Sequence, residues 1–302
     1  MYPEISIGTA QFGLKYGITN KKGIIDFDEA KKIFKTAELS GIRFIDTAQD
    51  YGMAEENIGK SLSNSRHQFK ITSKLSVKCF QENDVMDINL LERRFLESLR
   101  KLKLNKLDSF LIHDASILSK PNISELMNWL KSLRIRNLVN NIGVSIYKYN
   151  DLNGIKLDDF QLVQLPLSIY DQRCINNGLI DKLHEKGIKI HARSIFLQGL
   201  ILQDPKNWPD FLSEEFFSHH RKFSKNINLI NSNKLSEAIR FVLNNRKIEA
   251  FIIGISSLEE FICFLEKFNE IKNGNDHFLK DVSKYSWNNE YDLDPRLWLN
   301  KK

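Results

Sequence analysis

The chain has 302 residues, of which 42% are hydrophobic and 27% are charged. This length is enough for one large core. The net charge of +6 is modest, and the lysines are scattered rather than gathered into the basic patch that nucleic-acid binders use. No apolar run approaches the roughly 18 residues of a membrane span, and the first residues lack the features of a signal peptide. We therefore expect a cytoplasmic globular protein that binds neither nucleic acid nor membrane.

Three widely spaced cysteines, an odd number, argue against both a disulfide framework and a cysteine-rich zinc site. No other pattern of metal ligands stands out. His219 and His220 are adjacent but have no partner set, and we expect both to be exposed to solvent. The sequence predicts no metal.

Short β-rich runs alternate with longer amphipathic stretches along the chain. The expected strands cover residues 5–8, 43–46, 70–73, 109–113, 141–144, 162–165, 188–193 and 250–254. The expected helices cover residues 28–39, 55–62, 89–102, 124–136, 175–185, 234–244 and 258–271. Ser124 and Ser257 have the residue type and position of N-caps. This alternation predicts a closed parallel (β/α)8 TIM barrel.

An open doubly wound sheet is the alternative fold. It would carry a Gly-x-Gly-x-x-Gly loop after the first strand, and this sequence lacks that spacing. We expect a single domain over residues 1–302, with the barrel at about 5–272 and a tail at 273–302.

Two segments depart from a plain barrel. The loop after the seventh strand, roughly residues 194–233, is long, and a helix is expected near 213–223. The tail is rich in aromatic residues, and Trp287, Tyr291 and Trp298 either line a substrate pocket or fix the tail to the side of the barrel.

Polar side chains end three consecutive expected strands. Asp46, Lys74 and His113 should converge at the mouth where barrel enzymes place their chemistry, and Tyr51 follows Asp46 in the next loop. Each alone has an ordinary structural explanation, such as a turn cap or a packed ring. Together they match an acid–base site, because an ammonium group stabilises a phenolate and a carboxylate keeps that ammonium charged and in place.

The segments "GIRFIDTAQDYG", "ITSKL", "LIHD" and "IGVS" occur in the order and spacing of the aldo-keto reductase superfamily. "QLVQLP", "RSIFLQGL" and "FIIGISSLEE" continue the match, which runs from Ile5 to about Leu265. The chain resembles in particular the members that accompany bacterial surface-polysaccharide genes. The resemblance implies a (β/α)8 barrel that reduces carbonyl groups with a nicotinamide cofactor. It makes Tyr51 the proton donor, tuned by Lys74 and Asp46, and gives His113 the role of orienting the carbonyl.

The resemblance also implies a cofactor site. Its expected residues are Ser145, Gln164, Arg193, Ser194, Leu197, Gly199, Gly254, Ser256, Ser257 and Glu260. Ser145 and Gln164 would hold the nicotinamide carboxamide. The pyrophosphate would lie along the loop after the seventh strand and near the start of the last helix, where backbone N–H groups favour anions.

Several positions depart from the family pattern. Ile146 replaces an asparagine that contacts the carboxamide, and Arg193 replaces an aromatic ring beside the nicotinamide. The charge of Arg193 disfavours a cationic oxidised nicotinamide, which predicts that reduction is the favoured direction. Glu260 stands where many members hold the 2′-phosphate of NADP(H). Family habit slightly favours NADP(H), whereas the carboxylate of Glu260 argues for NAD(H).

The expected substrate is a small carbonyl compound, with a sugar or nucleotide sugar as the first candidate. The sequence leaves the oligomeric state open. The alternative is a catalytically weak regulatory protein of the same fold, favoured by the cofactor-site departures at Ile146, Arg193, Cys263 and Phe264. The N-terminus is too short for the hairpin that closes the barrel bottom in many members, so another element is expected there.

Overall fold

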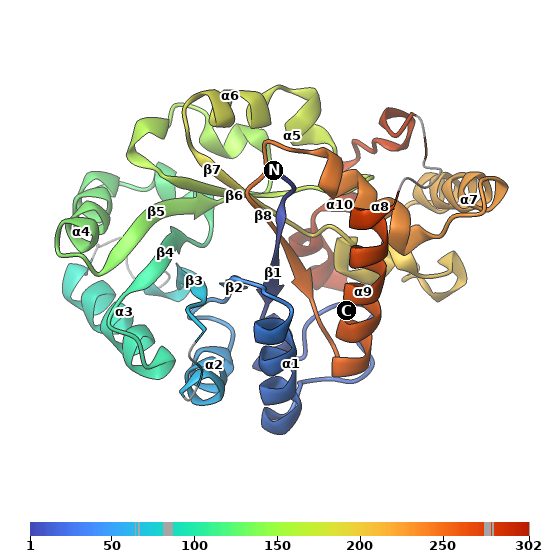
Figure 1. The fold of residues 1–302 in the computed structure, drawn as a ribbon. Coiled ribbons are helices and arrows are strands. Elements are labelled where there is room, and N and C mark those ends of the chain that lie inside the picture. The colour runs from blue at the N-terminus through green and yellow to red at the C-terminus, as the bar shows by residue number, and fades with distance from the viewer. Residues whose placement is uncertain (64, 66, 81–86, 275–278, 280, 302) are drawn as a thin grey trace.

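The computed structural model of the protein describes residues 1–63, 65, 67–80, 87–274, 279 and 281–301. Eight parallel strands pair in chain order and close into a barrel, which confirms the expected fold (Figure 1). The strands are β1 (Glu4–Gly8), β2 (Phe44–Asp46), β3 (Lys70–Leu75), β4 (Leu107–Ile112), β5 (Val139–Ser145), β6 (Leu162–Pro166), β7 (Lys189–Arg193) and β8 (Ala250–Gly254).

Helices surround the barrel and cover its strands. The longer ones are α1 (Phe27–Leu39), α2 (Ala54–Leu62), α3 (Ile88–Leu102), α4 (Ile123–Ile135), α6 (Leu179–Glu185), α7 (Glu214–Leu229), α8 (Lys234–Asn244) and α9 (Leu258–Asn273). Short helices α5 (Arg173–Asn176) and α10 (Glu290–Leu293) complete the set in the described ranges. In α3, helical spacing gathers Leu91, Phe95 and Leu99 on the buried face, and the side chain of Asp87 caps the first turn.

Two expectations about helix boundaries are wrong for local reasons. The helix expected at 175–185 is interrupted, because Gly178 adopts a left-handed φ of 75° between α5 and α6. Ser124 is not an N-cap, because Asn122 takes that position at the start of α4. Ser257 is the N-cap of α9, as expected, and its side chain accepts a hydrogen bond from the backbone N–H of Glu260.

The strand register brings the candidate side chains to one end of the barrel. Gly8 pairs with Asp46, Ser145 pairs with Gln164, and Pro166 pairs with Arg193. Each of these residues lies at or near the C-terminal end of its strand. Parallel strands therefore present them together at one mouth.

The opposite end of the barrel is filled by side chains from the strands. Phe44 of β2 and His191 of β7 are both buried, with ring centroids 5.4 Å apart across the interior. Lys70 lies over the other side of this cluster, 5.1 Å from the Phe44 ring. The expectation that another element covers this end of the barrel stays a prediction.

Helix α7 belongs to the long segment after β7 and projects beside the ring of helices (Figure 1). The expectation that its histidines are exposed is wrong. His220 is fully buried, with Nδ1 2.6 Å from the Tyr170 hydroxyl and Nε2 3.0 Å from the carbonyl of Gln203. Burial lowers the pKa of His220 to about 3. His219 is half-buried, with Nε2 3.0 Å from the carbonyl of Tyr285.

The aromatic residues of the tail make contacts within the tail and with α7. Trp298 is buried and donates from Nε1 to the carbonyl of Tyr291 over 2.8 Å. Trp287 donates to Asp292 and packs against Phe216 of α7. None of the three tail aromatics lines the main cavity. In the described ranges, the helices all fall short of the combined length and apolar character needed to cross a membrane.

Gly13 fixes the loop after β1 against the turn that carries Tyr51. A Cβ atom at Gly13 would lie 1.9 Å from the carbonyl oxygen of Tyr51, a backbone atom that cannot move aside cheaply. We expect Gly13→Ala to lower the free energy of unfolding by at least about 2 kcal/mol, measured by urea denaturation.

Gly154→Ala is the matched control for this substitution. Gly154 has φ of 75° and no atom within 4 Å of an added Cβ. Its replacement should therefore cost only the left-handed penalty of about 1 kcal/mol. Equal losses in the two variants would contradict the close approach at Gly13.

Candidate active site

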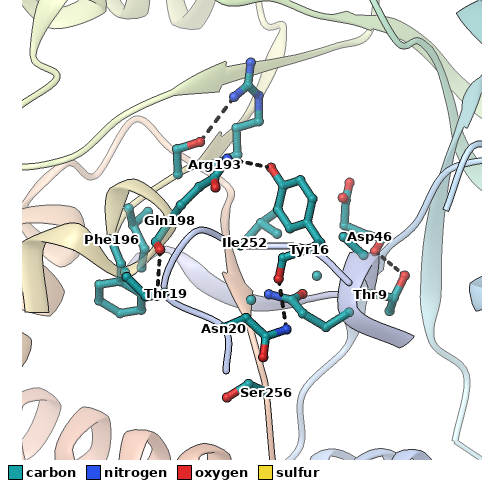
Figure 2. Close-up of a pocket in the computed structure, with 18 of the residues that line it drawn as sticks. Thr9, Tyr16, Thr19, Asn20, Asp46, Arg193, Phe196, Gln198, Ile252 and Ser256 are labelled. Atoms are coloured by element: carbon teal, nitrogen blue, oxygen red, sulfur yellow. Dashed lines mark hydrogen bonds between the residues drawn. The ribbon is translucent and has the colours of Figure 1, made fainter. Parts of the chain in front are cut away.

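Asp46 and Lys74 form a buried ion pair at the C-terminal ends of β2 and β3. The Lys74 ammonium donates to Asp46 Oδ2 over 2.6 Å and to the carbonyl of Thr47 over 2.9 Å. Gln164 donates to the other carboxylate oxygen over 2.7 Å. The Thr9 hydroxyl donates to the backbone carbonyl of Asp46 (Figure 2). Burial lowers the pKa of Lys74, and the Asp46 charge opposes this effect. The expected pairing is therefore present.

Tyr51 lies in the turn before α2, with its ring centroid 5.3 Å from the Lys74 ammonium. Burial and then the negative charge of Asp46 raise the pKa of Tyr51 well above its ordinary value. The Lys74 ammonium donates to Asp46 and Thr47 rather than to the Tyr51 phenol, so the tuning of Tyr51 by Lys74 stays a prediction.

His113 follows β4 and faces Tyr51, with the ring centroids 5.7 Å apart and the planes at 76°. Burial, followed by the charges of Lys74 and Arg193, lowers the pKa of His113 to about 3, so the ring is neutral at pH 7. In the described part of the chain its buried Nδ1 has no hydrogen-bond partner. Asp50 Oδ2 lies 3.9 Å from this nitrogen, which is too far for a hydrogen bond.

These side chains open into one cavity at the mouth of the barrel (Figure 2). The expected residues that line it are Asp46, Tyr51, His113, Ser145, Gln164, Arg193, Ser194, Gly199, Gly254, Ser256 and Glu260. Three expected residues do not line it. Lys74 is buried behind Asp46, the Leu197 side chain is buried in the core, and Ser257 caps α9.

The sequence analysis missed the contribution of the loop between β1 and α1. Tyr16, Thr19 and Asn20 of this loop line the cavity, as do Tyr147 after β5 and Gln198 after β7. The long polar segment directly after the first strand could have indicated that this loop contributes to the site. The side chains that turn inward depend on loop geometry, which no local pattern specifies.

Ser145 and Gln164 stand side by side at one end of the cavity, with Oγ 3.5 Å from Oε1. Because Gln164 already donates its amide N–H to Asp46, its Oε1 and the Ser145 hydroxyl are the groups available to a carboxamide. The Ile146 side chain is buried, so it adds no polar contact there. Ser145 and Gln164 can therefore bind a nicotinamide carboxamide. They offer it fewer hydrogen bonds than a site with an asparagine in place of Ile146.

Arg193 points toward the end of β5. It donates to the carbonyl of Ile146 over 2.7 Å and to the Ser194 hydroxyl over 3.2 Å. Its guanidinium carbon lies 3.9 Å from the centroid of the Tyr147 ring. The aromatic partner of Arg193 in this structure is thus Tyr147.

Two loops join across the cavity. The Thr19 hydroxyl donates to the carbonyl of Gln198 over 2.8 Å (Figure 2). The backbone N–H of Ile18 donates to the side chain of Gln198. Gly199 is required here, because its φ is 91° and an added Cβ would lie 2.1 Å from the Thr19 hydroxyl. The joined loops lie along the stretch where the sequence predicts the pyrophosphate.

The start of α9 is occupied by carboxylates. Glu260 accepts a hydrogen bond from the backbone N–H of Ser256 over 2.8 Å and another from the Ser256 hydroxyl. Glu29 of α1 accepts from the backbone N–H of Leu258 over 2.8 Å. The N–H groups that attract anions at a helix start are therefore partly taken by the protein's own acids.

Comparisons with known proteins show what the chain is similar to. The model of the aldo/keto reductase family matches residues 4–273. D-arabinose 1-dehydrogenase of Saccharomyces cerevisiae is 23% identical over 290 residues, covering 86% of this chain and 85% of that protein. The methylglyoxal reductase DkgB of Salmonella typhimurium is 27% identical over 177 residues, covering 56% of this chain and 62% of that protein.

Solved structures share the fold. The holo form of an aldo-keto reductase from Bacillus halodurans has a TM-score of 0.72 at 16% identity, covering 93% of this chain and 90% of that one. Glycerol dehydrogenase from Gluconobacter oxydans has a TM-score of 0.68 at 19% identity, with the same coverage. Because the family model spans nearly the whole barrel, this chain belongs to the aldo/keto reductase family of oxidoreductases.

Proposed function

We propose that the protein reduces a small polar aldehyde or ketone with a nicotinamide cofactor, and that Tyr51 is the general acid. The observation that carries this proposal is that Tyr51 and His113 face one cavity beside the buried Asp46–Lys74 pair. Relatives named for D-arabinose and methylglyoxal support a sugar or a similar oxygen-rich carbonyl compound as substrate.

In the proposed reaction the cofactor, Tyr51 and His113 have separate roles. The reduced nicotinamide, when bound, supplies the hydride for the carbonyl carbon. Tyr51 then gives its proton to the carbonyl oxygen as negative charge develops there, because an alkoxide is more basic than a phenolate. The high pKa of Tyr51 keeps it protonated until that moment. The neutral His113 donates or accepts a hydrogen bond at the same oxygen without adding charge.

Lys74 acts after the proton has moved. A phenolate at Tyr51 is unstable in a buried site, and the ammonium 5.3 Å from the ring supplies a compensating positive charge. Asp46 holds this ammonium in place over 2.6 Å. The ion pair thus offsets the charge that the reaction leaves behind.

We infer that NAD(H) is the preferred cofactor, against the family's habit. Within the described lining of the cavity, Arg193 is the only permanently charged cation. It lies at the end opposite Ser256 (Figure 2). A 2′-phosphate at the start of α9 would meet the carboxylate of Glu260, whereas a free 2′-hydroxyl can donate to it.

Tyr51→Phe tests the general acid. We expect carbonyl reduction to fall at least about 100-fold, while cofactor affinity, followed by tryptophan fluorescence, stays within about twofold. Tyr149→Phe, at an exposed tyrosine outside the cavity, should change neither quantity. Undiminished turnover by Tyr51→Phe would remove Tyr51 from the chemistry.

Glu260→Gln tests cofactor choice. Removing the carboxylate should shift the ratio of NADPH to NADH affinity toward NADPH by about tenfold. Glu259→Gln makes the same chemical change at the neighbouring exposed position of α9 and should leave the ratio unchanged. A wild-type protein that prefers NADPH, together with an unchanged ratio in Glu260→Gln, would contradict the inference.

The pH dependence of kcat/KM tests the protonation states. A His113 pKa of about 3 and a Tyr51 pKa raised well above 10 place both titrations outside neutral pH. We therefore expect neither group to produce a limb between about pH 5 and about pH 8. A limb in this range that disappears in Tyr51→Phe or His113→Asn would show that the corresponding pKa is different.

A further inference from the structure

Arg193 is a cation without a matching carboxylate in the described structure. It is half-buried and lines the cavity, and it donates hydrogen bonds to the carbonyl of Ile146 and the hydroxyl of Ser194. Lys74, by contrast, is paired with Asp46. A partly desolvated guanidinium with neutral partners retains its full charge toward the cavity. It is therefore suited to an anionic ligand.

The guanidinium is held in place by an aromatic stack. Its carbon lies 3.9 Å from the Tyr147 ring centroid, and the guanidinium carbon of Arg296 lies 3.5 Å from the same centroid. Two guanidinium groups this close to one centroid must occupy opposite faces of the ring. Tyr147 is therefore sandwiched between a barrel residue and a residue of the C-terminal tail.

The outer arginine of this stack is neutralised and fixed by acids. Arg296 pairs with Asp294 over 2.7 Å and with Asp114 over 3.5 Å. Asp114 directly follows His113, so the tail is tied to the loop that carries this candidate catalytic residue. Arg296 has carboxylate partners, whereas Arg193 has none within the described residues. Of the two arginines, Arg193 is therefore the one with an unmatched charge.

Arg193 also lies near the reacting groups. Burial and Asp46 raise the pKa of Tyr51, and the charge of Arg193 opposes this rise; after burial and Lys74, it also helps to lower the pKa of His113. The guanidinium contacts Ile146 and Tyr147, which follow β5, so it lies on the β5 side of the mouth. The start of α9 lies at the other end of the cavity (Figure 2). This placement favours contact with a substrate over contact with the far half of a dinucleotide.

We propose that Arg193 recognises an anionic group on the substrate, so that the preferred carbonyl compound carries a carboxylate or a phosphate. The proposal rests on the carbonyl reductase function proposed above. Tyr147 and Arg296 are positioning residues, which hold the guanidinium so that little freedom is lost when the anion binds. The remaining oxygen-rich part of the substrate would face the hydroxyls of Tyr16 and Tyr51.

The test compares charged and neutral carbonyl compounds of similar shape at saturating cofactor. Succinic semialdehyde with butanal tests a carboxylate, and D-glyceraldehyde 3-phosphate with D-glyceraldehyde tests a phosphate. For at least one pair, wild-type kcat/KM should favour the charged compound by at least about tenfold. Arg193→Gln should abolish that preference, and Arg193→Lys should keep part of it.

The control removes a positive charge from the rim of the mouth. Lys148 pairs with Glu290 over 3.2 Å and is not among the cavity-lining residues. Lys148→Gln should leave the preference unchanged, and thermal melting checks that each variant is folded. The proposal is overturned if the wild type shows no preference in either pair. It is also overturned if Arg193→Gln slows charged and neutral compounds equally, which would assign Arg193 to the cofactor.

A binding measurement separates this proposal from the proposed reaction. Calorimetry measures the binding of two anions to the wild type and to Arg193→Gln. The anions are inorganic phosphate and 4-hydroxybutyrate, the alcohol formed from succinic semialdehyde. If the protein reduces no carbonyl compound, binding that weakens at least about tenfold in the variant still supports the anion site. Absence of turnover together with absence of Arg193-dependent binding overturns it.

Discussion

The buried ion pair between Asp46 and Lys74 is the interaction on which the site depends. Two charges removed from water are stable only together, so neither side chain can turn away without leaving the other unpaired. Gln164 holds the second carboxylate oxygen from across the barrel, and Thr9 holds the backbone of Asp46. Strands β1, β2, β3 and β6 are thereby fixed relative to one another at the end of the barrel where Tyr51 lies.

This constraint explains why much of the site could be read from the sequence. Asp46, Lys74 and His113 end consecutive parallel strands, and a closed barrel brings such ends together whatever the intervening helices do. The strands themselves were recognisable because they are short, β-rich and bounded by helical periodicity. Gly178 shows the limit of this approach, because a single left-handed residue divided a stretch whose apolar spacing resembled one continuous helix.

The features that the sequence did not predict depend on where side chains point and on contacts between distant segments. The sequence places Arg193 at the end of a strand, but it does not show that the side chain would stack on Tyr147. It places His220 in a polar stretch, but burial of that ring depends on Tyr170, which lies 50 residues earlier in the chain. The raised pKa of Tyr51 is a similar case, since it depends on how deeply the ring is buried and on its closeness to Asp46.

The tail has a consequence for the order in which the protein is built. Arg296 follows every strand of the barrel in the chain, and it reaches Asp114 and Tyr147 at the mouth. During synthesis the residues of every strand, and with them Asp46 and Lys74, leave the ribosome before this arginine does. The barrel can therefore close before Arg296 makes this contact at its mouth.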